Sequence, residues 1–256
     1  MRTRTSLLLA CVVLLAFAGC AKRPVQPRFT TESIDSLLRG EGFVCHVEYR
    51  FASIRNAAGH PALEAIERAN IGYFFDLESF SGSAREAADS SMAHFAREYA
   101  MPSDVPAGGA PRGEILWEGE LSVESEASVV DSLLCYVITR SSYTGGAHGM
   151  YATVCHTYSL TDGFELSLAD LFEARQLEIL NRAIREKIAD EHGATSDEEL
   201  SALGFFPESF GLTENFLITP EGITFCYNPY EIGCYALGNV EVAFTWEELS
   251  ERFAGR

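Results

Sequence analysis

Apolar and polar residues alternate along several segments of this chain, and this two-residue period limits the fold more than any other feature. Residues 43–51 show it clearly, because every second side chain there is apolar or a cysteine. Successive side chains of a strand point to opposite faces, so this pattern predicts a strand with one buried face. Further strands are predicted over 115–123, 129–139, 150–160, 216–218, 223–227 and 240–244.

Four segments have a helical period instead. Pro61 begins a predicted helix that ends at Phe75, with four positions expected to be buried: Ile66, Ile71, Phe74 and Phe75. Ser83 and Glu86 form a capping box ahead of a second helix. A third helix follows Ser167 and ends at Gly193, and a short one covers 246–253. Because strands and helices do not alternate regularly, we expect an α+β fold, a largely antiparallel sheet with helices packed on it.

The first residues have the outline of a bacterial lipoprotein signal. Arg2 and Arg4 precede an apolar stretch, residues 6–17, which is shorter than the roughly 20 residues of a membrane-spanning helix. Small residues then stand directly before Cys20. We expect residues 1–19 to be removed, Cys20 to carry a lipid such as palmitate, and residues 20–40 to form a flexible tether. The alternative is an ordinary secretory signal cleaved elsewhere.

The chain is acidic, with 19 basic and 37 acidic residues and a formal net charge of −18. Loss of Arg2 and Arg4 with the signal changes this charge to −20. Such a charge repels nucleic acid and favours basic partners, although it also serves the solubility of an exported protein. We therefore expect no nucleic-acid partner.

Five cysteines remain besides Cys11 of the signal and Cys20. Three stand in apolar alternating runs and are expected to be buried free thiols: Cys45, Cys135 and Cys155. Cys226 and Cys234 flank a short loop, and an exported compartment would permit a disulfide between them.

Two segments are candidate binding loops. The first holds three glycines around a histidine, so that its backbone can approach a ligand closely; its candidate residues are Tyr143, Thr144, Gly145, Gly146, His148 and Gly149. His148 is either a contact residue or proton carrier, or a side chain that bonds the loop backbone. The second places tyrosines beside a proline; its candidate residues are Asn228, Pro229, Tyr230, Glu231 and Tyr235. Its rings either bind a ligand or pack over the sheet edge.

Several kinds of site are not indicated by the sequence. No close His or Cys pairing of a metal site is present, and neither a Gly-x-Ser-x-Gly elbow nor a phosphate-binding glycine loop followed by lysine occurs. We therefore expect no metal, no cofactor and no catalytic residue. Acidic residues are so numerous that a glycosidase-like pair of carboxylates would arise by chance, and their abundance decides nothing.

Four motifs in order resemble a known family. They are Tyr-Thr-Gly-Gly-Ala-His-Gly at 143–149, Leu-x-Asp-Leu-Phe at 168–172, Tyr-Asn-x-Tyr-Glu-Ile at 227–232 and Tyr-Ala-x-Gly at 235–238. The family is that of the RsiV/PdaC-type extracytoplasmic domains, a domain of unknown function 3298 preceded by a half like domain of unknown function 4163. The resemblance extends over residues 41–254 and implies one compact domain formed by two halves, 41–149 and 150–256.

Members of this family include the extracellular part of lysozyme-sensing anti-sigma factors and the non-catalytic part of peptidoglycan deacetylases. This sequence shows no sigma-binding segment, no transmembrane helix and no deacetylase metal motif, so we expect neither activity. The resemblance implies a non-catalytic lipoprotein of the cell envelope that binds a lysozyme-like protein or peptidoglycan. The alternatives are an envelope glycan hydrolase that uses His148 and a carboxylate such as Glu231, and a structural envelope protein. The lipid would anchor it to a membrane, which we expect to be the outer one, facing the periplasm or the cell surface.

Overall fold

The computed structural model describes residues 23–40, 42–98, 117–145 and 147–255. The expected signal peptide, the lipidation site Cys20 and the candidate loop residue Gly146 lie outside these ranges. None of the helices in the described part of the chain combines the length and apolar character needed to cross a membrane.

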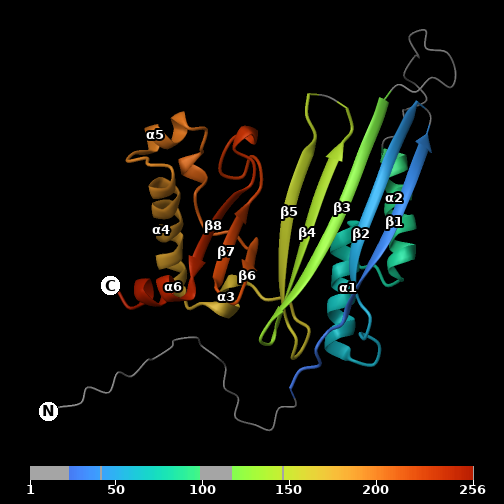
Figure 1. The fold of residues 1–256 in the computed structure, drawn as a ribbon, viewed down its shortest axis with the longest axis horizontal. Helices are drawn as coiled ribbons and strands as arrows, with labels where there is room; N and C mark the ends of the chain where they lie inside the picture. Colours follow the sequence, from blue (N-terminus) through green and yellow to red (C-terminus); the bar gives the residue numbers. More distant parts are fainter. Residues whose placement is uncertain (1–22, 41, 99–116, 146, 256) are drawn as a thin grey trace.

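A five-stranded sheet forms the N-terminal part of the molecule (Figure 1). It has the order β1-β2-β3-β4-β5 and consists of β1 (Phe29–Gly40), β2 (Phe43–Ile54), β3 (Trp117–Val130), β4 (Leu133–Tyr143) and β5 (Met150–Ser159). All neighbours are antiparallel except β2 and β3, which run parallel. Parallel neighbours need a long crossover, and α1 (Pro61–Phe75) and α2 (Ala84–Glu98) lie in this connection. The predicted α+β class with a largely antiparallel sheet is confirmed.

The expected tether ends earlier than predicted, because residues 29–40 form β1. This strand pairs along its whole length with β2, from Phe29 opposite Ile54 to Gly40 opposite Phe43. Among its side chains Ile34 alone is buried, so the segment lacks the alternation that marks a strand. Backbone hydrogen bonds to β2 therefore define this strand, although its side-chain pattern does not predict one.

The boundary between the next two strands also differs from the prediction. Val129 and Val130 belong to the end of β3, and β4 begins only at Leu133. The turn between them places Asp131 at a φ of 54°, a left-handed conformation that Asp tolerates better than most residues. The two apolar residues therefore lie before the turn and not after it.

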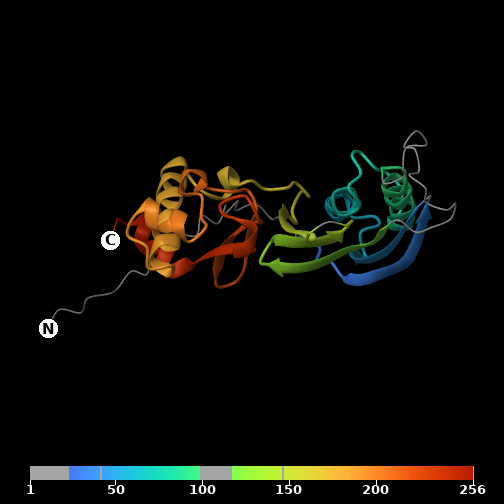
Figure 2. The ribbon, with the colours of Figure 1, turned by 90° about the horizontal axis from the view of Figure 1, so that it is seen from above.

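Both N-terminal helices cover one face of the five-stranded sheet (Figure 2). The helix predicted over 61–75 is present with the same bounds, and its four expected core residues are all buried. Edge-to-face ring contacts join helix and sheet, with centroids 5.1 Å apart for Phe51 and Phe74 and 5.2 Å apart for Tyr49 and Phe75. The capping box before α2 is confirmed, because Glu86 Oε2 accepts the Ser83 N–H at 2.8 Å.

The C-terminal part contains a second sheet of three antiparallel strands, β6 (Phe216–Ile218), β7 (Gly222–Tyr227) and β8 (Val240–Thr245). Its helices are α3 (Leu168–Leu171), α4 (Ala174–Glu191), α5 (Asp197–Ala202) and α6 (Trp246–Phe253), with the short 3-10 turns η1 (Pro207–Ser209) and η2 (Tyr235–Leu237). The apolar stripe of α4 packs on this sheet through buried residues that include Leu180, Ile184 and Ile188. The helix predicted over 246–253 is α6.

The described residues thus form two sheets and two hydrophobic cores, where the sequence led us to expect a single sheet. One core is drawn from residues between Ile34 and Leu160, and the other mainly from residues between Leu168 and Leu249. The expected boundary between the two halves, at residues 149 and 150, falls within the first sheet, because β5 pairs with β4. The second core begins after the hairpin that follows β5.

Candidate functional site

The two candidate loops lie side by side, although 78 residues, 150–227, separate them in the sequence. The ring of Tyr235 stacks on that of His148, with centroids 4.0 Å apart and planes 24° apart. The Tyr235 hydroxyl also donates a 2.7 Å hydrogen bond to the Gly149 carbonyl. The glycine-rich segment before β5 and the tyrosine-rich segment after β7 therefore form one surface.

Four aromatic side chains make up this surface, which we name the aromatic rim: His148, Tyr151, Tyr230 and Tyr235. Tyr235 is its centre, because the ring of Tyr151 lies 5.6 Å and that of Tyr230 lies 5.8 Å from the Tyr235 ring. Tyr230 is 52% exposed, His148 is exposed, and the two other tyrosines are half-buried. Rings that are fixed on one side and open to solvent on the other suit a contact surface for a ligand.

Glycine is required in the first loop by close backbone approach. A Cβ atom on Gly149 would lie 2.9 Å from the Ser142 carbonyl oxygen, so any other residue would push β4 and β5 apart at this point. Gly145 has a φ of +94°, in the region that side chains rarely adopt. Tyr143 is 40% exposed and Thr144 half-buried beside it.

His148 bonds its own loop. Its Nδ1 lies 2.9 Å from the Gly149 carbonyl, and a carbonyl can only accept, so Nδ1 carries the proton. In the neutral tautomer that has this proton on Nδ1, Nε2 is an acceptor. Glu231, the expected carboxylate partner, instead accepts the backbone N–H of Asn228 at 2.9 Å. His148 and Glu231 thus each bond the backbone of their own loop, and the described residues show no hydrogen bond between these two side chains.

The tip of the second loop is a four-residue turn from Asn228 to Glu231, closed by a hydrogen bond from the Glu231 N–H to the Asn228 carbonyl. Pro229 occupies its second position and is buried. Tyr230 occupies the third position with a φ of 73°, a conformation that glycine normally adopts there. Strain of this kind, held by surrounding bonds, is typical of binding sites.

Asn228 has a structural role that the sequence did not reveal. Its side chain accepts the Thr153 N–H at 2.7 Å and donates to the Thr153 carbonyl at 3.1 Å. Asn215 does the same next to it, accepting from the Cys155 N–H at 2.8 Å and donating to the Thr153 carbonyl at 2.8 Å. Two asparagine side chains thus bond backbone N–H and carbonyl groups at the edge of β5 that a further strand would otherwise bond.

Sequence reasoning missed Tyr151, Thr153 and Asn215 at this site. Tyr151 and Thr153 stand within a strand pattern that looks ordinary, and Asn215 stands directly before a short strand. No spacing in the sequence links them to the loops, because the link is made by the packing of β5 against the second sheet.

The structure contains no disulfide between Cys226 and Cys234, since both are free thiols. Cys226 lies instead near Cys155 of β5. The neighbouring Cys226 thiol and burial raise the pKa of the Cys155 thiol. Cys45, Cys135 and Cys155 are buried, as predicted.

A second polar cluster ties α1 to β5. Glu165 accepts one hydrogen bond from the Tyr73 hydroxyl at 2.8 Å and lies 2.6 Å from Nδ1 of His156. The rings of Tyr73 and His156 stack with centroids 4.0 Å apart. Burial raises the pKa of the Glu165 carboxyl, but the bonds from His156 and Tyr73 outweigh it, so that the pKa lies below its ordinary value. The described residues contain no group of three or more metal-ligating side chains placed to hold an ion.

Comparison with solved structures shows that this fold has been seen before. A DUF3298 family member from Bacteroides fragilis superposes with a TM-score of 0.73 at 23% identity, covering 90% of this chain and 94% of that one. A DUF3298 family protein from Pseudomonas aeruginosa superposes with a TM-score of 0.58 at 16% identity, covering 89% and 94%. No curated protein matches the sequence.

A family model locates the resemblance within the chain. It is described as a protein of unknown function, DUF3298, and it matches residues 169–247, which run from α3 to α6 and include the second candidate loop. Residues 169–247 therefore match the DUF3298 family model, and the chain shares its fold with two solved proteins that are described as DUF3298 family members.

Proposed function

We propose that this protein is a non-catalytic, lipid-anchored binding module of the bacterial cell envelope whose aromatic rim captures a lysozyme-like protein or peptidoglycan. The observation that carries the proposal is the rim itself. Its central ring, Tyr235, contacts three other aromatic rings, and one of them, Tyr230, is held exposed on a strained turn.

The charge of the chain favours a protein ligand over the glycan. A formal net charge of −18 attracts a basic protein such as a lysozyme and speeds its encounter with the rim, whereas it offers nothing to the acidic groups of peptidoglycan. Aromatic side chains near the centre of an interface usually contribute most of its affinity. A basic lysozyme-like protein is therefore the first ligand to test.

The remaining parts of the proposal concern the family and the anchor. We propose that residues 41–149 correspond to the half like domain of unknown function 4163, and that the whole resembles the RsiV/PdaC type. The four motifs in order support this, together with the DUF3298 match in the C-terminal part. The apolar segment that precedes Cys20 supports a lipid anchor.

The test is capture of purified lysozyme by the immobilised protein, followed by replacement of Tyr230. Tyr230→Ala should weaken capture by about 2 kcal/mol, because it removes a large exposed ring at the interface. Tyr230→Gly should weaken it equally while raising the unfolding temperature, since glycine relieves the positive φ. Phe164→Ala is the matched control, because Phe164 is 71% exposed but does not belong to the rim.

Two results would count against the proposal. If Tyr230→Ala and Phe164→Ala capture lysozyme as the unchanged protein does, the rim is not the contact surface. Release of soluble fragments from labelled peptidoglycan by the purified protein would favour a glycan hydrolase instead. If the unchanged protein binds peptidoglycan without hydrolysing it and Tyr230→Ala does not bind it, the rim is the contact surface but its ligand is peptidoglycan.

A further inference from the structure

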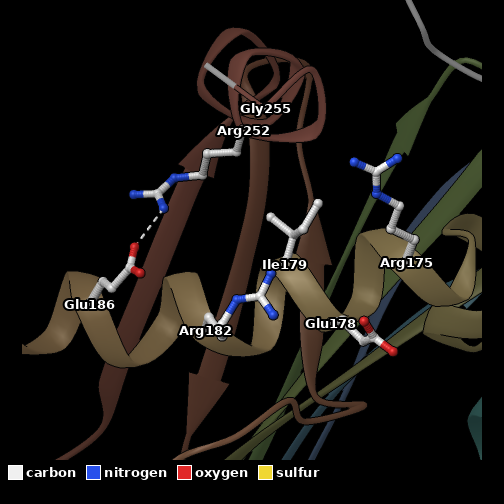
Figure 3. Close-up of a pocket in the computed structure, with 7 residues that line it drawn as sticks. All are labelled: Arg175, Glu178, Ile179, Arg182, Glu186, Arg252 and Gly255. Atoms are coloured by element: carbon white, nitrogen blue, oxygen red, sulfur yellow. Dashed lines mark hydrogen bonds and ion pairs between the residues drawn. The ribbon is translucent and has the colours of Figure 1, made fainter.

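A pocket of about 380 Å³ opens between α4 and α6, and its lining is almost entirely charged (Figure 3). Three arginines line it, Arg175 and Arg182 from α4 and Arg252 from α6, together with two glutamates, Glu178 and Glu186. Arginine side chains gather here although acidic residues outnumber basic ones in the chain, 37 against 19. This surface is built from other elements than the aromatic rim.

Arg175 and Arg182 have no acidic partner in the described part of the chain, where no carboxylate oxygen lies within 4.0 Å of either guanidinium. They stand seven residues apart, which places them on the same face of a helix two turns apart. Glu178 lies between them in the sequence at spacings that permit ion pairs with both, yet it forms neither. Neither guanidinium is therefore held in an ion pair, although the Glu178 carboxylate lines the same pocket.

Arg252 is held in place on the opposite side. It forms an ion pair of 2.9 Å with Glu186 and one of 3.6 Å with Glu248, and its guanidinium lies 5.7 Å from the centre of the Phe244 ring. Because Glu186 is already paired with Arg252, it does little to offset the charges of Arg175 and Arg182. A fixed guanidinium loses less conformational entropy when it also contacts a ligand.

From this geometry we infer that the pocket is a binding site for a phosphate group. Guanidinium groups from two helices face one space, and a phosphate has enough oxygen acceptors to bond several of them at once. A carboxylate offers two oxygens in one plane and is satisfied by a single arginine fork. An apolar ligand is disfavoured, because Ile179 is the one apolar side chain in the lining.

The phosphate has two sources with the same chemistry, a soluble phosphorylated compound and the headgroup of a phospholipid. Two soluble probes distinguish them: inorganic phosphate, which carries a monoester-like double charge, and glycerophosphoglycerol, the phosphodiester headgroup of phosphatidylglycerol without its acyl chains. Each is titrated by calorimetry into the purified full chain held in non-ionic detergent, in a buffer free of sulfate.

We expect the unchanged protein to bind inorganic phosphate, with an affinity that falls as salt is raised. The double variant Arg175→Gln and Arg182→Gln should lose on the order of tenfold in affinity, because two charge-assisted contacts disappear. The matching replacement by Lys keeps both charges but not the forked geometry and should lie between the two. Arg85→Gln on α2 is the control, since Arg85 is also exposed and lies outside the pocket.

Binding of both probes supports a phospholipid headgroup, and binding of inorganic phosphate alone supports a soluble phosphorylated ligand. Absence of measurable binding by the unchanged protein overturns the inference, and so does equal binding by the double Gln variant with an unchanged unfolding temperature. Because the variants leave Tyr230 and the rest of the rim intact, lysozyme capture tests the proposed function separately.

Discussion

Asn228 bonds both backbone groups of Thr153, as a neighbouring strand would, through 2.7 Å and 3.1 Å hydrogen bonds from one side-chain amide. This pair of bonds lies where the edge of the first sheet meets the second candidate loop. It fixes the position of the turn that carries Tyr230, because the backbone N–H of Asn228 is in turn bonded to Glu231. A loop residue that looked like a ligand contact in the sequence therefore positions the site.

Asn228→Ala should lower the free energy of unfolding by about 2 kcal/mol, since two partly buried hydrogen bonds are lost and the Thr153 N–H is left without this partner. Urea unfolding measures this change. Asn239→Ala is the control, because Asn239 makes one 3.3 Å bond to the Thr153 hydroxyl and is exposed, so its replacement should cost less than about 0.5 kcal/mol. If both substitutions lower the free energy of unfolding equally, the hydrogen bonds from Asn228 to Thr153 do not contribute more than an exposed bond.

Local patterns predicted the elements with strong periodicity. The helices over 61–75 and 246–253 have the predicted bounds, because Pro61 and the Thr245 cap fix where they begin and apolar stripes fix which face is buried. The first strand was missed for the opposite reason, since its side chains are mostly exposed and pairing with β2 forms it. A strand that forms mainly through pairing with its neighbour need not show an alternation of apolar and polar residues.

The loops of the candidate site could be predicted from the sequence, but the residues of other segments that contact these loops could not. Glycines and a proline between strands mark turns, and antiparallel strands gather such turns at sheet ends, which is why the two loops could be expected together. The stacking of His148 on Tyr235 agrees with that expectation. Asn215 and Tyr151 could not be found this way, because their roles depend on how the second sheet packs against β5. The arginine pocket likewise needs the packing of α6 on α4.

Cys226 and Cys234 should both react with an alkylating reagent when the protein is purified without reductant and unfolded in the presence of the reagent. The structure has both as free thiols, with Cys226 turned toward Cys155 on the neighbouring sheet. Peptide mass spectrometry measures the modification of each cysteine. A peptide pair joined through Cys226 and Cys234 would contradict the structure, and one joined through Cys226 and Cys155 would show that their contact oxidises.

Acid should weaken the contact between α1 and β5 at Glu165. The pKa of this carboxyl is lower in the folded protein than its ordinary 4.5, because the bonds from His156 and Tyr73 outweigh the effect of burial. A carboxyl of lowered pKa adds stability that is fully present above its unfolded pKa and lost as the pH falls through the folded one. Glu165→Gln should therefore be less stable than the unchanged protein at neutral pH, and this difference should shrink below pH 4.5.

Urea unfolding from about pH 7 to about pH 3 measures both curves. The size of the effect is limited by solvent, since the Glu165 side chain is 38% exposed. Glu64→Gln on α1 is a useful control, because Glu64 bonds only the backbone N–H of Gly59 in an exposed position. A difference between the unchanged protein and Glu165→Gln that stays constant across this range would show that the carboxyl is not held in its charged form by His156 and Tyr73.

We propose that Cys20 carries a lipid, and Cys20→Ala should then abolish lipidation. The thiol follows Ala18 and Gly19 after a short apolar run, the order in which a signal precedes a lipidated cysteine, and a thiol is required for the thioether to form. Cells grown with a fatty-acid probe should label the unchanged protein and the control Cys11→Ala, whose cysteine lies within the apolar run and takes no lipid. Cys20→Ala should remain unlabelled. Persistent labelling of Cys20→Ala would place the lipid elsewhere, whereas loss of labelling in both variants would mean that the apolar run itself was damaged.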